Sequence, residues 1–286
     1  MQYLSPLRYP GGKARLARYM GQLIEDNGLI GGHYVEPYAG GAGVALALLY
    51  LEYSSHVHLN DLNRSVHAFW SACLDHPEEM CRRVADTPLD MDEWRRQREV
   101  QRAESPSVLD LGFSTLYMNR TNRSGVIKGG VIGGKEQAGQ WKIDARFNRK
   151  DIGSRIEKFA SYKSRVTLHG QDALALIKKL GASTPANTLF YLDPPYYRKA
   201  EKLYDNHYKP ADHAELAGAI AQLDRPWVVS YDDQPEIRTL YSAFRQEVFG
   251  INYSAGPVAK GSEVMIYGPK INASASAVST WRGIAA

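Results

Sequence analysis

Short apolar runs alternate with stretches of helical hydrophobic spacing along most of the chain. The apolar runs lie at residues 33–40, 56–61, 165–170, 188–193 and 227–231, and the helix-like stretches at 44–52, 174–180 and 212–223. Strands that alternate with helices in this way are typical of β-α-β units and a mostly parallel sheet. Two later runs, 245–253 and 263–267, have no helix between them and predict an antiparallel end. We therefore expect a doubly wound α/β fold.

The middle of the chain has a different character. Residues 63–118 contain no convincing strand and look helical, and residues 118–165 contain twelve Lys or Arg against four Asp or Glu, a net charge of +8. Since the whole chain carries +4, the remainder sums to −4. A basic excess suits phosphate groups, although a solvated basic face has the same composition. The glycine-rich run at 125–140 predicts a long loop or a hairpin.

This pattern predicts one domain inserted into another. Residues 1–62 and 163–272 form the doubly wound domain, residues 63–162 form a helical and basic insertion, and residues 273–286 form a flexible tail. The 286 residues are 44% hydrophobic, which is enough for a well-buried core. Because no apolar run approaches the length of a membrane span and the N-terminus lacks a signal-peptide core, we expect a cytoplasmic protein that does not bind a membrane.

The sequence does not favour a metal site or a catalytic cysteine. The two cysteines, Cys73 and Cys81, show no metal-binding spacing, and neither do the eight histidines. Cys73 lies in an apolar stretch that looks helical, which favours packing over nucleophilic catalysis. Structural or solvated roles are expected for the histidines at strand and helix ends: His56, His58, His169 and His213. We expect no metal ion.

The first candidate for chemistry is the turn at residues 36–43, EPYAGGAG, which joins a predicted strand to a predicted helix. Glycines allow a tight turn and the close approach of a ligand, and a helix N-terminus favours anionic groups. The next strand ends at Asp61, where an acidic side chain is placed to accept hydrogen bonds from ribose hydroxyls. These features predict a site for a nucleoside-containing cofactor, although a purely structural turn remains an alternative.

The second candidate is Asp193-Pro194-Pro195-Tyr196-Tyr197, directly after the apolar run at 189–192. Two consecutive prolines cannot continue a strand ladder and fix an extended backbone. They hold the Asp193 carboxylate and the Pro194 carbonyl at the carboxyl end of the strand, where open α/β sheets bind ligands. Two acceptors beside an aromatic ring suit the exocyclic amino group of a base. A strand end that Asp193 merely caps is the structural alternative.

The order of these motifs points to a family. Residues 6–13, PLRYPGGK, come first, followed by the glycine turn, the insertion and the DPPY sequence at 193–196. Over roughly residues 5–270 the chain resembles the Dam-like adenine-N6 DNA methyltransferases, the D12 class of the alpha group. The resemblance implies a Rossmann-like sheet of seven strands with the last one antiparallel, S-adenosylmethionine as cofactor, and double-stranded DNA as partner. Restriction–modification, phage and orphan contexts are all compatible with it, and we expect a monomer or a weak dimer.

The resemblance also implies roles for individual residues. The positions that match cofactor-binding residues are Tyr9, Gly12, Lys13, Glu36, Tyr38, Gly40, Asp61 and Asp193, and those that match the catalytic motif are Asp193, Pro194, Pro195 and Tyr196. Asp193 and the Pro194 carbonyl would accept the two N–H bonds of a flipped adenine while Tyr196 stacks on the base. Inside a duplex the amino nitrogen is inaccessible, so the base must leave the stack.

The family's DNA-recognition hairpin begins where this chain has residues 119–125, NRTNRSG. The candidate DNA contacts are Asn119, Arg120, Asn122, Arg123, Lys128 and Lys135. For each asparagine a purely structural role in a turn is an equal alternative. Further along, residues 140–148 mix aromatic, basic and amide groups, and a buried turn around Trp141 and Phe147 is the alternative to DNA contact. The arginine-tyrosine-asparagine pattern of GATC-reading members is missing, so the resemblance does not extend to GATC specificity.

Other activities fit the sequence less well. Methylation of cytosine N4 also uses an exocyclic amine, but such enzymes more often carry Ser at the first position of the motif and another motif order. Methylation of RNA adenine or of protein glutamine usually goes with Asn at that position. Cytosine-C5 methylation needs a cysteine thiolate in a Pro-Cys context, which the chain lacks. A catalytically silent DNA-binding relative is disfavoured by the intact Lys13, Asp61 and Asp193.

Overall fold

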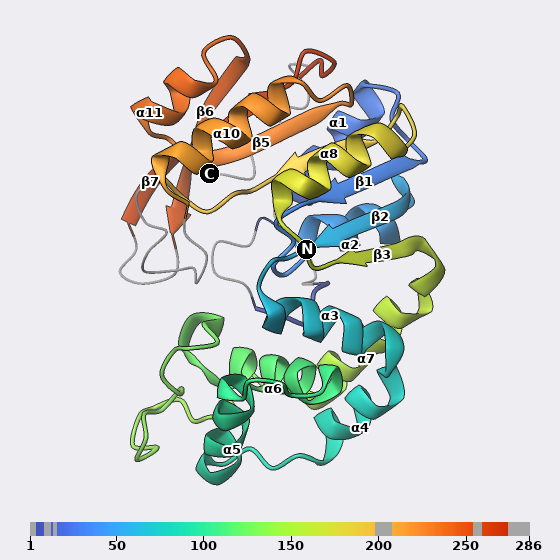
Figure 1. Ribbon diagram of the computed structural model, residues 1–286. Helices are drawn as coiled ribbons and strands as arrows, with labels where there is room; N and C mark the ends of the chain where they lie inside the picture. Colours follow the sequence, from blue (N-terminus) through green and yellow to red (C-terminus); the bar gives the residue numbers. More distant parts are fainter. Residues whose placement is uncertain (1–3, 9–12, 14–15, 198–207, 254–258, 274–286) are drawn as a thin grey trace. The chain divides into compact units, whose positions relative to one another are not determined.

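A mixed sheet of seven strands organises one part of the molecule, as the computed structural model shows (Figure 1). The strands are β1 (Gly32–Glu36), β2 (Ser54–Asn60), β3 (Val166–His169), β4 (Leu189–Leu192), β5 (Trp227–Asp232), β6 (Arg245–Tyr253) and β7 (Ala259–Tyr267). Their spatial order is β3-β2-β1-β4-β5-β7-β6. The first five are parallel, and β7 runs antiparallel to both β5 and β6. The predicted α/β sheet with an antiparallel end is confirmed.

The structure describes residues 4–8, 13, 16–197, 208–253 and 259–273. These fall into two compact units. The sheet unit contains the described residues of 13–62 and 165–273, and the helical unit contains residues 4–8 and 63–164. None of the helices in these segments is long and apolar enough to cross a membrane.

Five helices accompany the strands in the sheet unit. They are α1 (Ala17–Asp26), α2 (Gly43–Tyr50), α8 (Ala173–Ser183), α10 (Pro210–Ala221) and α11 (Pro235–Leu240). Every residue of β4 and β5 is buried, as expected for parallel strands with both faces covered. The six-residue helix α11 was not among the helices predicted from the sequence, because so short a segment shows no clear hydrophobic period.

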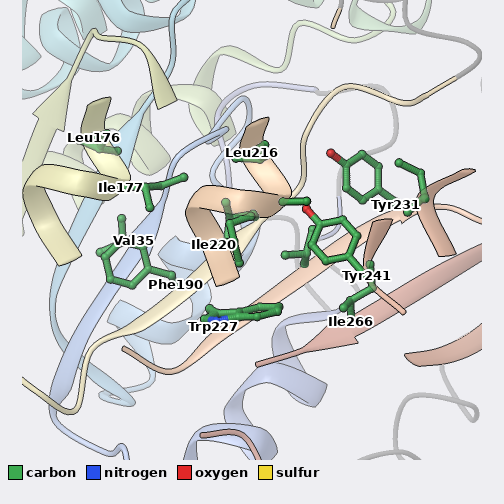
Figure 2. Packing of buried hydrophobic residues seen from close by; sticks show 14 of the residues in the cluster. Val35, Leu176, Ile177, Phe190, Leu216, Ile220, Trp227, Tyr231, Tyr241 and Ile266 are labelled. Carbon is green, nitrogen blue, oxygen red and sulfur yellow. The ribbon is translucent and has the colours of Figure 1, made fainter. Parts of the chain in front are cut away.

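The largest core cluster joins α8 and α10 to the central strands (Figure 2). Its labelled side chains include Leu176 and Ile177 from α8, Leu216 and Ile220 from α10, Phe190 from β4 and Trp227 from β5. All of these are at most 1% exposed. This packing fixes the middle of the sheet, and with it the loops that follow β1 and β4.

The order of the strands reverses between β1 and β4. These two strands pair directly in parallel, yet β2 and β3 continue from β1 on one side while β5 continues from β4 on the other. The loops leaving their carboxyl ends therefore run apart, and such a switch point is the usual ligand-binding position in open α/β sheets. Both candidate motifs, the turn at 36–43 and the sequence at 193–196, begin here.

The helical unit contains five α-helices: α3 (Arg64–Asp75), α4 (Pro77–Asp86), α5 (Met91–Arg102), α6 (Val108–Thr121) and α7 (Arg149–Ser161). The short 3-10 turns η2 (Arg123–Gly125) and η3 (Lys163–Arg165) follow α6 and α7. Helix α6 is buried from Leu111 to Thr121 and forms the centre of the unit. Gly112 allows this close packing, because a Cβ there would lie 2.7 Å from the carbonyl oxygen of Ala68 in α3.

Between η2 and α7 the chain follows a series of turns without regular secondary structure. One antiparallel bridge joins Asn122 to Val131, so the glycine-rich run forms the predicted long loop and only a minimal hairpin.

Candidate active site

The turn after β1 is held in a conformation that needs glycine. Gly40 has a φ of 46°, in the left-handed region, and Ala42 at the N-cap of α2 has a φ of 48°. The amide of Ala42 donates to the carbonyl of Ala39 at 2.6 Å, which closes the turn. The result is a tight loop that leads into the N-terminus of α2, as the sequence predicts.

Two adjacent residues at the end of β2 fasten this turn. Asp61 accepts a hydrogen bond from the amide of Gly40 through Oδ2 at 3.0 Å, so the predicted ribose acceptor lies at the turn. The buried Asn60 donates to the carbonyls of Pro37 and Gln171 at 2.9 and 3.0 Å and accepts from the amide of Gln171 at 3.1 Å. Asn60 thereby ties together the loops that follow β1 and β3. Its role was not predicted, because its partners are 23 and 111 residues away.

The Asp193 side chain lies directly after β4, held from the neighbouring strand β5. Ser230 donates to its Oδ1 at 2.8 Å, and the hydroxyl of Tyr191 lies 2.8 Å from the same serine oxygen. The amide of Tyr197 donates to Asp232 Oδ1 at 2.9 Å, which anchors the end of the motif. The side chain of Asp193 is still 23% exposed, so it can reach a ligand.

Lys13 and Glu263 complete a cluster of charged groups around Asp193. The Lys13 ammonium pairs with Oε1 of Glu263 and lies 3.6 Å from Oδ1 of Asp193. It also lies 5.5 Å from the ring centre of Tyr196, whose hydroxyl donates to the same Glu263 oxygen at 3.0 Å. Tyr196 is 4% exposed, so the predicted stacking ring is covered in this structure.

Glu263 on β7 was missed in the sequence. Its side chain is 1% exposed, and Oε2 has no hydrogen-bond partner among the described residues. The one sequence signal for Glu263 is that an acidic residue begins the apolar run EVMIY. A carboxylate buried with such a strand needs a compensating partner. That partner, Lys13, lies 250 residues earlier in the chain.

The charges of this cluster shift each other's pKa. Burial alone would lower the pKa of Lys13, but the charges of Asp193 and Glu263 outweigh it and hold the ammonium protonated. Burial raises the pKa of Asp193, opposed by the Lys13 charge and the Ser230 hydrogen bond. Burial likewise raises the pKa of Glu263, against the opposing charge of Lys13. The pKa of Glu36 is raised by burial and then by the charge of Asp193. The arrangement is rich in carboxyl groups and suits a cationic ligand.

The remaining predicted cofactor residues are Tyr38, which the structure describes, and Tyr9 and Gly12, which it does not; the two prolines of the catalytic motif are also described. Tyr38 is partly buried and packs against the core cluster, and its hydroxyl lies 2.8 Å from that of Tyr208. Tyr9 and Gly12 lie outside the described residues. Pro194 is buried and Pro195 is partly buried, as part of the extended segment after β4.

Three of the predicted DNA contacts have structural roles in the helical unit. Asn119 is 2% exposed and donates to the carbonyls of Arg8 and Gly125, and the Arg120 guanidinium bonds to the carbonyl of Pro6. Asn122 is fully buried and accepts from the indole of Trp94 at 2.8 Å. The prediction that these three side chains contact DNA does not agree with this placement, because their donors and acceptors are already used inside the unit.

The other three predicted DNA contacts, Arg123, Lys128 and Lys135, are exposed on the helical unit. Phe147 is 5% exposed whereas Trp141 is 64% exposed, so the buried turn considered for this pair holds only for Phe147. Cys73 is buried, and burial raises the pKa of its thiol, which disfavours a thiolate nucleophile. No group of three or more His, Cys, Asp or Glu side chains in the described part of the chain is arranged to hold a metal ion.

Comparison with known families gives one match. The sequence model of a family described as D12 class N6 adenine-specific DNA methyltransferase matches residues 9–253. This range includes both motifs at the switch point and the whole helical unit from residue 63 onward. No curated protein sequence matches the chain.

Proposed function

The chain belongs to the D12 class N6 adenine-specific DNA methyltransferase family, and we propose that it takes the methyl group from S-adenosylmethionine and transfers it to an adenine flipped out of duplex DNA. The observation that supports this most directly is the position of Asp193. It follows β4 at the switch point of the sheet, beside the glycine turn that follows β1.

The residues at the glycine turn fit this cofactor. Gly40 and the N-terminus of α2 provide a close backbone approach, and Asp61 lies beside the turn, where a ribose hydroxyl can donate to it. Oε2 of the buried Glu36 has no hydrogen-bond partner among the described residues, which leaves an acceptor for a ligand. When bound, S-adenosylmethionine supplies a methyl group on a positively charged sulfur. The carboxyl groups of Glu36, Asp193 and Glu263 favour that charge.

Asp193 is the proposed acceptor for the adenine amino group. Its Oδ1 takes the hydrogen bond from Ser230 and faces Lys13, so Oδ2 is the oxygen that we assign to the amino N–H. The Pro194 carbonyl accepts the second N–H. These two bonds favour a tetrahedral nitrogen with a free lone pair, and they stabilise the positive charge that grows on it as the nitrogen–carbon bond forms and the carbon–sulfur bond breaks. The methylated nitrogen then loses one proton to solvent, and the former methyl donor is left as a neutral thioether. Rigid prolines hold both acceptors in place without reorganisation.

We assign Lys13 primarily to this charged cluster, and contact with the cofactor is secondary. Its ammonium is shared between Glu263 and Asp193, which offsets the repulsion between these two carboxyl groups. Glu263 also holds the hydroxyl of Tyr196, the aromatic residue of the catalytic motif. We therefore assign Glu263 a positioning role for Lys13 and Tyr196.

The helical unit is the proposed DNA-reading part of the enzyme, and the sheet unit the catalytic part. Arg123, Lys128 and Lys135 are exposed cations that can contact phosphates. Binding of duplex DNA as a monomer or weak dimer, in the cytoplasm of a bacterial or phage-infected cell, completes the proposal.

Replacement of Asp193 tests the assignment. Asp193→Ala should bind S-adenosylmethionine and duplex DNA, as measured by calorimetry and fluorescence anisotropy, but lose methyl transfer by several orders of magnitude. Asp193→Asn, which keeps an acceptor but also brings donors and no charge, should retain little activity. Turnover close to wild type in either variant would remove Asp193 from the reaction.

A further inference from the structure

Trp141 is the one tryptophan among the described residues that is left in solvent. Its side chain is 64% exposed, whereas Trp70, Trp94 and Trp227 are at most 4% exposed. A single exposed apolar side chain is common on protein surfaces and means little alone. Two further observations on the same loop make the exposure of Trp141 significant.

The first observation is that the loop is built around a side chain that holds it in one shape. The amide nitrogen of Gln137 donates to the carbonyls of Ile132 and Gly134, both at 2.7 Å. Its amide oxygen accepts from the backbone of Ile143 at 2.9 Å. One glutamine therefore links both sides of the loop at residues 131–143, and the loop is not a frayed segment.

The same construction turns Trp141 outward. Val131 and Ile143, at the two ends of this loop, are 3% and 4% exposed and pack inward. Gly133 has a φ of 86°, and a Cβ there would lie 2.7 Å from the carbonyl oxygen of Trp141, so the backbone of the tryptophan is held close to that glycine. Between buried anchors, the indole is the large side chain that the loop presents to solvent.

The second observation is charge. Residues 122–148 contain five Lys or Arg and two Asp or Glu, a net charge of +3. Arg123, Lys128, Lys135 and Arg146 are exposed. A polyanion is therefore the partner that this loop attracts, and an exposed aromatic ring among cations is the combination used to stack on nucleic-acid bases. A protein partner of mainly apolar character would not be favoured by these charges.

We propose that Trp141 stacks on bases of the DNA duplex, and that the loop at 131–143 is a preformed support for that contact. The proposal rests on the proposed function, since it takes duplex DNA as the substrate. In this arrangement the surrounding cations hold the phosphates, and the indole covers a base face exposed when the target adenine leaves the stack.

Trp141→Ala tests the proposal against Trp141→Phe, which keeps an aromatic face. We expect Trp141→Ala to weaken duplex binding by about 5- to 150-fold, the range found for loss of one stacked aromatic residue. Trp141→Phe should stay within about fivefold of wild type. The matched control is Leu51→Ala in the sheet unit, since Leu51 is also 64% exposed, and its binding should be unchanged.

The salt dependence separates stacking from charge. Because the indole is neutral, Trp141→Ala should leave the slope of log K against log salt unchanged, while Lys135→Ala should reduce it by about 0.9. Tryptophan fluorescence gives a direct signal: DNA should quench the wild type more than Trp141→Phe. Unchanged affinity of Trp141→Ala, or equal quenching of wild type and Trp141→Phe, would overturn the proposal. Failure of the wild type to bind or methylate any duplex would instead overturn the proposed function.

Discussion

Glu263→Gln tests the charged cluster at the active site in the most specific way. The substitution keeps the size of the side chain and an oxygen that can accept from the Tyr196 hydroxyl, but it removes the charge that holds Lys13. Lys13, already 3.6 Å from Oδ1 of Asp193, then has Asp193 as its main counter-charge and moves onto it. A closer ammonium at Oδ1 draws negative charge away from Oδ2 and so weakens the hydrogen bond that Oδ2 accepts from the adenine amino group.

The size of the effect follows from the hydrogen bond at stake. A hydrogen bond to a charged group contributes about 1.5–3 kcal/mol, and its loss in the transition state corresponds to a rate decrease of about 10- to 150-fold. The affinity for S-adenosylmethionine should change much less than the rate. Glu247→Gln on β6, which removes a carboxylate paired with Arg245, is the control and should transfer methyl groups at the wild-type rate.

The pH dependence gives the second readout. Asp193 acts as a carboxylate, so activity is lost as the pH falls through its pKa, which burial raises above the ordinary value. Removing the negative charge of Glu263 and bringing Lys13 closer both lower the pKa of Asp193, so the acid limb should move to lower pH. The assay is single-turnover transfer of a labelled methyl group to duplex DNA across the pH range. An unchanged rate with an unchanged acid limb would refute the reasoning.

Three further predictions follow from other parts of the sheet unit. Asp61→Ala should weaken S-adenosylmethionine binding by about 10- to 100-fold in calorimetry. Asp61→Asn should weaken it less, because an amide oxygen can still accept from the Gly40 amide. An affinity of Asp61→Ala equal to that of the wild type would remove Asp61 from the cofactor site. Asn60→Ala should lower the free energy of unfolding in urea by about 2–4 kcal/mol, because the buried carbonyl of Pro37 and the partly buried carbonyl of Gln171 both lose their donor. A loss below about 0.5 kcal/mol would contradict this. Burial, reinforced by the neighbouring His56, His169 and His33, lowers the pKa of His58 to about 3. As the pH falls below 6.5, His58 therefore gains a proton in the unfolded chain but stays neutral in the folded protein. Stability should therefore decrease by at most about 2 kcal/mol between pH 7.5 and pH 5, and His58→Asn should show a smaller decrease; identical pH dependence would exclude His58 as the cause.

The sheet was predictable because its signals are local. The first four parallel strands are short apolar runs with a helix-like stretch after each, and the β6–β7 pair lacks such a stretch. The positions of Asp61 and Asp193 follow from the same reasoning, since both stand where an apolar run ends. The prediction that Asp193 lies at the carboxyl end of a parallel strand is confirmed.

The contacts that complete the site are between residues far apart in the chain. Glu263 and Lys13 are 250 residues apart, and nothing in either local sequence indicates the other. The same holds for Arg120, whose residue type suggests an exposed phosphate contact. It is buried because the carbonyl of Pro6, 114 residues earlier, accepts its hydrogen bonds. Local sequence indicates residue type and element, whereas burial depends on partners that only the fold brings together.

The central claim is methyl transfer to the amino nitrogen of adenine in DNA, and nucleoside analysis measures it directly. The purified protein is incubated with mixed-sequence duplex DNA and S-adenosylmethionine that carries a deuterated methyl group, and the digested DNA is examined by mass spectrometry. We predict labelled N6-methyldeoxyadenosine with the wild type and none with Asp193→Ala. Label on cytosine N4, or an equal yield from both proteins, would contradict the account.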